Sequence, residues 1–117
     1  MTVRRLNRLI HVSAAALSFS LGVLSADMVA AGRKPTTHTV TIDASKFEPA
    51  AVTVKVGDTV VWVNNDVVAH TATSKTGRFD SGLIAPGKSW TYRANRIGEF
   101  AYTCTYHPTM NATLRVK

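Results

Sequence analysis

Short runs in which β-branched or aromatic residues alternate with polar ones follow one another along most of this chain. Seven such runs occupy residues 37–43, 51–56, 59–64, 69–74, 88–94, 98–104 and 111–117. The pair Gly57-Asp58 separates two of them as a sharp turn would, and Pro86-Gly87 precedes another. No window repeats its apolar residues every 3.6 positions, as an amphipathic helix does. The pattern predicts an all-β chain, folded as an antiparallel β-sandwich of about seven or eight strands.

The beginning of the chain has a different composition from the rest. The first ten residues hold three arginines and no acidic residue, and residues 9–26 are apolar or small apart from His11. Val29 and Ala31 then stand in the spacing of a signal-peptidase cleavage site. These features predict a secretory signal peptide over residues 1–31 and one exported domain over residues 32–117, a length that buries a single modest core.

The pattern leaves two properties of this leader open. An uncleaved membrane anchor is the alternative to a signal peptide, because the apolar run approaches the about 20 residues that span a bilayer. The pair Arg4-Arg5 is a weak twin-arginine feature, so the general secretory and twin-arginine export routes both stay open. With cleavage, we expect a periplasmic monomer that has no membrane span.

The charge of the chain argues against one class of partner. The formal net charge is +7, but the basic residues are scattered and form neither a run nor a stripe interleaved with aromatic residues. Nucleic acid is therefore a poor candidate. A moderately basic surface favours solubility, or steers the protein toward an acidic partner or an anionic surface.

One stretch near the end of the chain gathers sulfur and nitrogen donors. Residues 104–110 read CTYHPTM and contain the only cysteine, Cys104, together with His107 and Met110. In an oxidising compartment, a single cysteine cannot form an internal disulfide and needs another explanation. Taken singly, these residues have ordinary interpretations as a buried thiol, a loop histidine and a core methionine. Taken together, they predict a metal site.

An upstream histidine, His70, completes the candidate set. It lies at the edge of the predicted strand over residues 69–74, whereas Cys104, His107 and Met110 share one tight connection between two strands, at one end of the sandwich. Iron–sulfur clusters need about four cysteines, and a thioether is a poor zinc ligand. Two histidines, one cysteine and a weak axial methionine are the ligands of blue-copper electron-transfer sites. The set predicts one copper ion; His38 has no such neighbours and is interpreted as a surface residue.

Beyond these residues, nearly all of the chain after the leader resembles the cupredoxins, and in particular the bacterial group that is similar to amicyanin and plastocyanin. The supporting segments are VGDTVVWVNND, AHT, FDSG, PG and YTC, with CTYHPTM in the C-x-x-H-x-x-M spacing of amicyanin. The resemblance implies a Greek-key β-sandwich with a type 1 copper near one end. By position, Cys104 would be the thiolate ligand, His70 and His107 the imidazole ligands, and Met110 the weak axial ligand.

The resemblance also implies a surface for electron exchange, formed by the edge of His107 with Tyr106 and Pro108. Tyr106 stands where amicyanins usually carry proline, which implies a bulkier surface patch. Thr71 stands where asparagine is usual, and we expect a contact between Thr71 and Thr105 to tie the two ligand segments together. The acidic patches of plant plastocyanins are absent from this sequence.

Three functions are consistent with these features. The first is an exported carrier that passes single electrons between transient redox protein partners; it would not be an enzyme, because four protein ligands leave no open position for a substrate. The alternative is a copper-handling protein for storage, delivery or resistance, without a dedicated electron-transfer partner. The third is an adhesion-type sandwich that binds no metal.

Overall fold

The computed structural model describes residues 15–16, 18 and 32–117. The chain divides into two units, Met1–Gly32 and Arg33–Lys117, and the second holds all of the β-strands described here. The predicted signal peptide, residues 1–31, lies outside the described residues apart from those three positions. Among the residues that the structure describes, no helix is long and apolar enough to cross a membrane.

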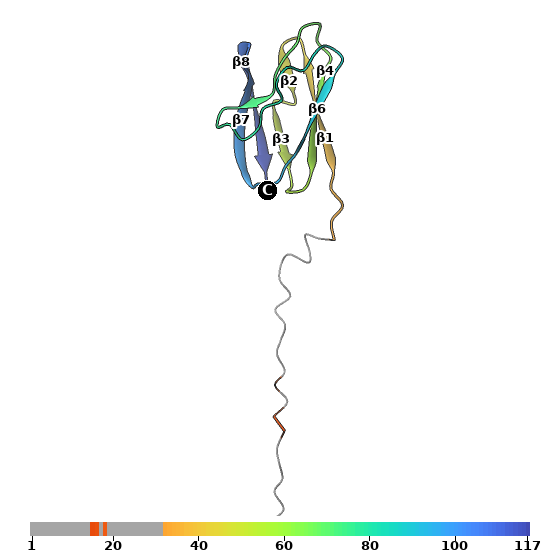
Figure 1. The fold of residues 1–117 in the computed structure, drawn as a ribbon, viewed down its shortest axis with the longest axis vertical. Helices are drawn as coiled ribbons and strands as arrows, with labels where there is room; N and C mark the ends of the chain where they lie inside the picture. Colours follow the sequence, from red (N-terminus) through yellow and green to blue (C-terminus); the bar gives the residue numbers. More distant parts are fainter. Residues whose placement is uncertain (1–14, 17, 19–31) are drawn as a thin grey trace, which may run out of the picture. The chain divides into compact units, whose positions relative to one another are not determined.

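Eight strands form the unit Arg33–Lys117 (Figure 1). They are β1 (Thr37–Asp43), β2 (Lys46–Glu48), β3 (Ala51–Val54), β4 (Thr59–Asn64), β5 (Thr73–Ser74), β6 (Ser89–Arg93), β7 (Gly98–Cys104) and β8 (His107–Val116). One sheet has the order β2-β1-β4-β6 and the other the order β3-β8-β7-β5. This arrangement confirms the predicted all-β sandwich and its number of strands.

The strand directions differ in part from the predicted antiparallel arrangement. β1 pairs with β4 in parallel, and β3 pairs with β8 in parallel, whereas the other four pairings are antiparallel. A hairpin turn enforces antiparallel pairing only between consecutive strands. Because β2 and β3 intervene between β1 and β4, and β3 has crossed to the other sheet, no turn sets the relative direction of β1 and β4. Each sheet is therefore mixed.

Four strands begin or end elsewhere than predicted, and β3 and β6 are each only two residues shorter than the runs at 51–56 and 88–94. Only Thr73–Ser74 of the run at 69–74 is a strand, and His70 makes an isolated bridge with Ile84 instead. β8 already begins at His107 rather than after Met110. β2 was not predicted, because a strand of three residues with one buried side chain shows too little alternation to detect.

Aromatic rings fill the space between the two sheets. Trp62 from β4 and Tyr102 from β7 are fully buried and meet edge to face, with ring centroids 5.5 Å apart. Phe47 packs on Tyr102 at 4.8 Å and Phe79 on Trp62 at 5.6 Å. Successive residues of a strand point to opposite faces, so Tyr102 and Cys104 share the inward face of β7. The aromatic core thus extends toward the end of the sandwich where Cys104 lies.

The corner between β3 and β4 is held by a buried carboxylate. Asp58 is 2% exposed, and its oxygens accept backbone N–H groups of Thr36 and Lys55 at 2.9 and 3.0 Å. His38 Nε2 lies 3.0 Å and an Arg33 guanidinium nitrogen 2.9 Å from the same group. The two backbone N–H groups, followed by His38 and Arg33, hold the pKa of Asp58 well below its usual range despite burial. His38 is thus a partner of Asp58 rather than a free surface residue.

We expect the Asp58→Asn variant to be less stable than the parent at pH 7, with a deficit that shrinks in acid. A depressed carboxyl pKa contributes stability that is fully present above the unfolded pKa of about 3.9 and is lost as the pH falls below it. Denaturant unfolding midpoints at pH 7 and pH 3 measure this difference. A deficit of equal size at both pH values would contradict the role assigned to the charge of Asp58.

Candidate metal centre

The four predicted residues come from two loops and the strands beside them. Cys104 is the last residue of β7 and His107 the first of β8, so only Thr105 and Tyr106 separate the two strands. Cys104 pairs with His107 after a register shift at Thr103/Cys104, which marks an irregularity in the ladder at this point. A two-residue connection leaves little freedom, and it holds the Cys104 and His107 side chains side by side.

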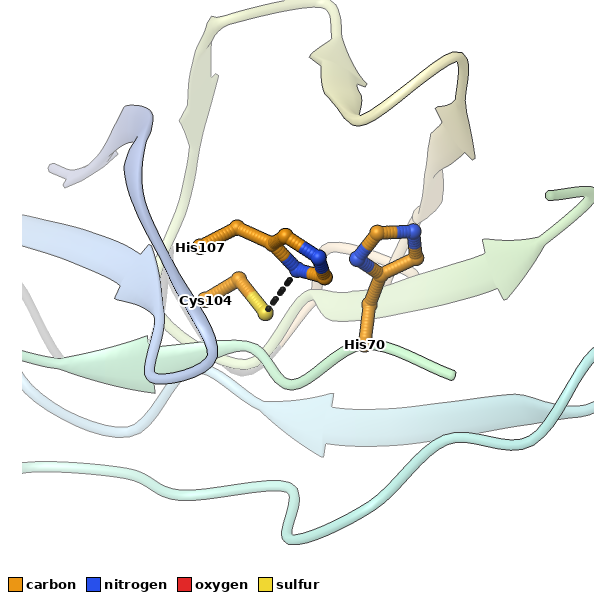
Figure 2. A group of neighbouring side chains, drawn as sticks. All are labelled: His70, Cys104 and His107. Carbon is orange, nitrogen blue, oxygen red and sulfur yellow. Dashed lines mark hydrogen bonds between the residues drawn. The ribbon is translucent and has the colours of Figure 1, made fainter. Parts of the chain in front are cut away.

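His70 arrives at the same place from the segment between β4 and β5. Its backbone N–H donates to the carbonyl of Ile84 and its carbonyl accepts from Ile84 N–H, at 3.1 and 2.7 Å. The Nδ1 or Nε2 atoms of His70 and His107 and the Sγ atom of Cys104 that would bind an ion all lie within 4.8 Å of one another. Figure 2 shows the two imidazole rings facing each other, with the Cys104 sulfur directed at the His107 ring. The structure therefore brings these three predicted residues together.

The three side chains differ in exposure. His70 and Cys104 are fully buried, whereas His107 is half-buried. Cys104 Sγ lies 3.4 Å from His107 Nδ1 (Figure 2), and the ring centroids of the two histidines are 4.8 Å apart. His107 is thus the member of the cluster that reaches the surface.

Met110, the fourth predicted residue, lies on β8 three positions after His107 and is 3% exposed. Its backbone carbonyl accepts a hydrogen bond of 2.7 Å from Thr103 Oγ1, on the neighbouring strand β7. This bond ties the start of β8 to the end of β7 beside Cys104. Met110 is therefore buried on the strand that pairs with β7 next to Cys104, and its role as the axial ligand stays a prediction.

The buried ring of His70 has one nitrogen that no protein group satisfies. Its Nε2 lies 2.9 Å from Asp66 Oδ2, but its Nδ1 is buried without a hydrogen-bond partner. Burying a polar atom without a partner is costly, and such atoms are rare in native proteins. An ion held between the Nδ1 of His70, the sulfur and the second imidazole removes this cost. By donor chemistry, the two histidines, Cys104 and Met110 fit a single type 1 copper ion.

Asp66 was not among the residues predicted from the sequence. The Ser45 backbone N–H, followed by the His70 ring and the Val67 N–H, holds the pKa of Asp66 below its usual range, so the carboxylate is ionised at neutral pH. An aspartate four residues before a histidine in a loop carries no recognisable spacing rule. Only the folded loop shows that the two side chains meet.

A hydrogen-bonded contact links the two segments that carry the cluster. Thr71 N–H points at Cys104 Sγ at 3.4 Å, and Thr105 N–H donates to Thr71 Oγ1 at 3.0 Å. The hydroxyl groups of Thr71 and Thr105 are 3.3 Å apart. The expected contact between these two threonines is confirmed. Hydrogen bonds to a cysteine sulfur are one of the means by which a protein adjusts the reduction potential of a blue-copper site.

Apolar side chains are exposed on the loops that carry the cluster. Tyr106, next to His107, is 65% exposed, and Val67 and Val68, shortly before His70, are 89% and 44% exposed. Leu83, next to Ile84 of the His70 bridge, is 62% exposed. Together we call these four residues the apolar rim. The sequence indicated only Tyr106 of these four, because the exposure of Val67 and Val68 has no sequence signal and Leu83 joins the site through the fold.

Comparisons with known proteins agree with this site. A family model described as the cupredoxin-like domain matches residues 12–116. The amicyanin of Paracoccus versutus is 32% identical over 101 residues, which cover 81% of this chain and 76% of the amicyanin. The chloroplastic plastocyanin of Tetradesmus obliquus is 38% identical over 72 residues, which cover 52% of this chain but only 50% of the plastocyanin.

A solved structure shows the same fold. A purple cupredoxin from Nitrosopumilus maritimus superposes with a TM-score of 0.62 and 24% identity, covering 68% of this chain and 99% of that protein. The family match extends over nearly the whole chain, and the similarity to amicyanin covers most of both proteins. The chain therefore belongs to the cupredoxin-like domain family, as a cupredoxin of the amicyanin and plastocyanin type.

Proposed function

We propose that this protein is exported and carries single electrons between larger redox proteins through one type 1 copper ion, with His70, Cys104, His107 and Met110 as the ligands. One observation carries the proposal. The unsatisfied, buried Nδ1 of His70 belongs to a cluster whose donor atoms come from two imidazoles and a thiol within 4.8 Å of one another. When bound, copper would supply a Cu(I)/Cu(II) couple at this point.

The residues around the cluster hold the donor atoms in a fixed arrangement. Asp66 fixes one side of the His70 ring, and the Thr71 N–H fixes the Cys104 sulfur. The two-residue turn between β7 and β8 fixes His107 relative to Cys104. Such rigidity suits electron transfer, because a site that does not rearrange changes charge with little reorganisation. Four protein ligands also leave no position for a substrate, which supports a carrier rather than an enzyme.

The exposed face of the site supports contact with protein partners. Of the three clustered side chains, only His107 reaches the surface, next to Tyr106 of the apolar rim. The edge of its ring therefore gives the shortest path for an electron between the metal and a partner. Redox encounters are brief and use small interfaces, below about 1,200 Å². The four side chains of the rim carry no charge, so contact with a partner through them does not require matched charges. We infer a monomer that docks transiently through this rim, in the periplasm if the leader is removed.

Titration of the purified protein with copper(II) tests the proposal. We expect an intense visible band that saturates at one copper per chain, bleaches with ascorbate and returns with ferricyanide. Absence of the band would contradict the type 1 site. A band that forms but does not return after reduction, with rapid loss of copper(I) to a chelator, would instead favour the copper-handling function.

A further inference from the structure

The carboxylate of Asp66 joins the turn between β1 and β2 to its own segment between β4 and β5. Its Oδ2 accepts the backbone N–H of Ser45 at 2.9 Å and lies 2.9 Å from Nε2 of His70. Its Oδ1 accepts the N–H of Val67 at 2.8 Å. The side chain is only 12% exposed, and the His70 ring beside it is fully buried. The carboxylate is thus a built part of the interior and not a mobile surface group.

The Ser45 N–H comes from an unusual turn between β1 and β2. Asp43 pairs with Lys46, so Ala44 and Ser45 alone form the turn, and both have positive φ, 46° and 55°. Two-residue hairpin turns of this kind usually carry asparagine and glycine, because other residues are strained there. The turn points the N–H of Ser45 at a carboxylate 21 residues further along the chain. A strained turn that is held in this way suggests that its position matters to the group it contacts.

Both oxygens of Asp66 accept backbone N–H groups, and a carboxylate can only accept hydrogen bonds, so His70 Nε2 is the donor in this pair. A neutral imidazole carries one proton, and Nδ1 is therefore left as a lone pair inside the cluster. A proton on Nδ1 would block the only nitrogen of His70 that faces Cys104 and His107 (Figure 2). The choice of tautomer thus decides whether His70 can bind a metal ion at all.

We propose that Asp66, held in place by the Ser45 N–H of the β1–β2 turn, is a positioning residue that keeps buried His70 in its Nε2–H tautomer and so couples that turn to the metal centre. The effect on copper rests on the proposed function. The effect on the tautomer does not, because it concerns the protein without metal. The two parts can therefore be tested separately.

The tautomer is measured by nitrogen-15 NMR of the His70 ring in the metal-free protein at pH 8, where imidazoles are ordinarily neutral. We expect a single Nε2–H form in the parent and a mixture of both tautomers in Asp66→Ala. Asp66→Asn should restore the single form, because its amide oxygen still accepts from Nε2–H. The Ser45 amide should exchange with solvent faster in Asp66→Ala. A single Nε2–H tautomer in Asp66→Ala, with unchanged Ser45 exchange, would overturn the proposal.

Asp43→Asn is the matched control. Asp43 belongs to the same hairpin, but its carboxylate contacts only the N–H of Ala44 and does not reach His70. We expect this variant to leave both the His70 tautomer and the exchange of the Ser45 amide unchanged. A change as large as that in Asp66→Ala would show that any disturbance of the hairpin suffices, and it would overturn the specific role of Asp66.

Copper binding gives the second readout. Loss of an outer hydrogen-bond partner of a ligating histidine typically weakens metal affinity about 10–100-fold, and we expect that loss in Asp66→Ala. Asp66→Asn should keep most of the affinity but raise the reduction potential, because a negative charge near the more positive oxidised ion is removed. Equal affinity in the parent and Asp66→Ala would overturn the coupling. Failure of the parent itself to bind copper would refute the proposed function while the tautomer result stood.

Discussion

Replacing Cys104 by serine is expected to abolish the intense copper–thiolate absorption of the protein. The sulfur is fully buried, lies 3.4 Å from His107 Nδ1 and receives the Thr71 N–H. Copper(I) prefers soft sulfur ligands, and a serine hydroxyl is a hard, neutral and weak donor. The loss of affinity should exceed the about 10–100-fold that removal of an outer partner of a ligand costs. Serine is close to cysteine in size, so the fold should survive.

Absorption spectra and copper affinities of Cys104→Ser and the parent measure this effect, and an unchanged far-ultraviolet circular dichroism spectrum shows that the variant is folded. His38→Gln is the control for removal of a metal-binding side chain, because His38 contacts Asp58 and is not part of the cluster. We expect this control to keep its copper band. Colour that persists in Cys104→Ser would contradict a thiolate ligand and the carrier function with it.

The sequence predicted the metal-binding side chains better than the residues that hold those side chains in place. Cys104 and His107 flank one two-residue turn, so their spacing alone predicted that they meet. His70 lies 34 residues before Cys104, and its place followed only if the two segments packed together in the sandwich. Asp66 and the Ser45 N–H escaped prediction, because their contact joins a hairpin turn to a loop through tertiary structure.

The strands show the same contrast: the local pattern predicted the bounds of several strands, but not which strands pair with each other. The predicted bounds of β1, β4 and β7 agree with the structure, since each alternates over six or seven residues. The parallel pairings of β1 with β4 and of β3 with β8 were not predicted. Alternation shows which face of a strand is buried but contains no information on its neighbour, and no turn connects these pairs directly.

The Trp62→Ala variant should lose about 3–5 kcal/mol of unfolding free energy, the usual cost of truncating a buried aromatic side chain. Trp62 is fully buried on β4 and meets Tyr102 of the other sheet edge to face, so its ring bridges the two layers of the sandwich. Its centroid also lies 5.6 Å from that of Phe79 and 5.4 Å from that of Trp90. Because small domains are stable by only about 5–15 kcal/mol, this loss is a large fraction of the total stability.

Denaturant unfolding of the metal-free parent, Trp62→Ala and Trp62→Phe distinguishes loss of packing from loss of the indole N–H. Within the described part of the chain, the buried Trp62 ring nitrogen forms no hydrogen bond of good geometry and has only the Tyr102 hydroxyl near it as a weak partner, so replacement by phenylalanine removes little hydrogen bonding while it keeps a ring. We therefore expect Trp62→Phe to cost clearly less than Trp62→Ala. Trp90→Ala is the control, because Trp90 is only half-buried and lies in the same sheet as Trp62. If Trp90→Ala cost as much as Trp62→Ala, burial between the sheets would not be the source of stability. If Trp62→Phe cost as much as Trp62→Ala, a hydrogen bond of the indole N–H would contribute more to stability than the burial of the ring.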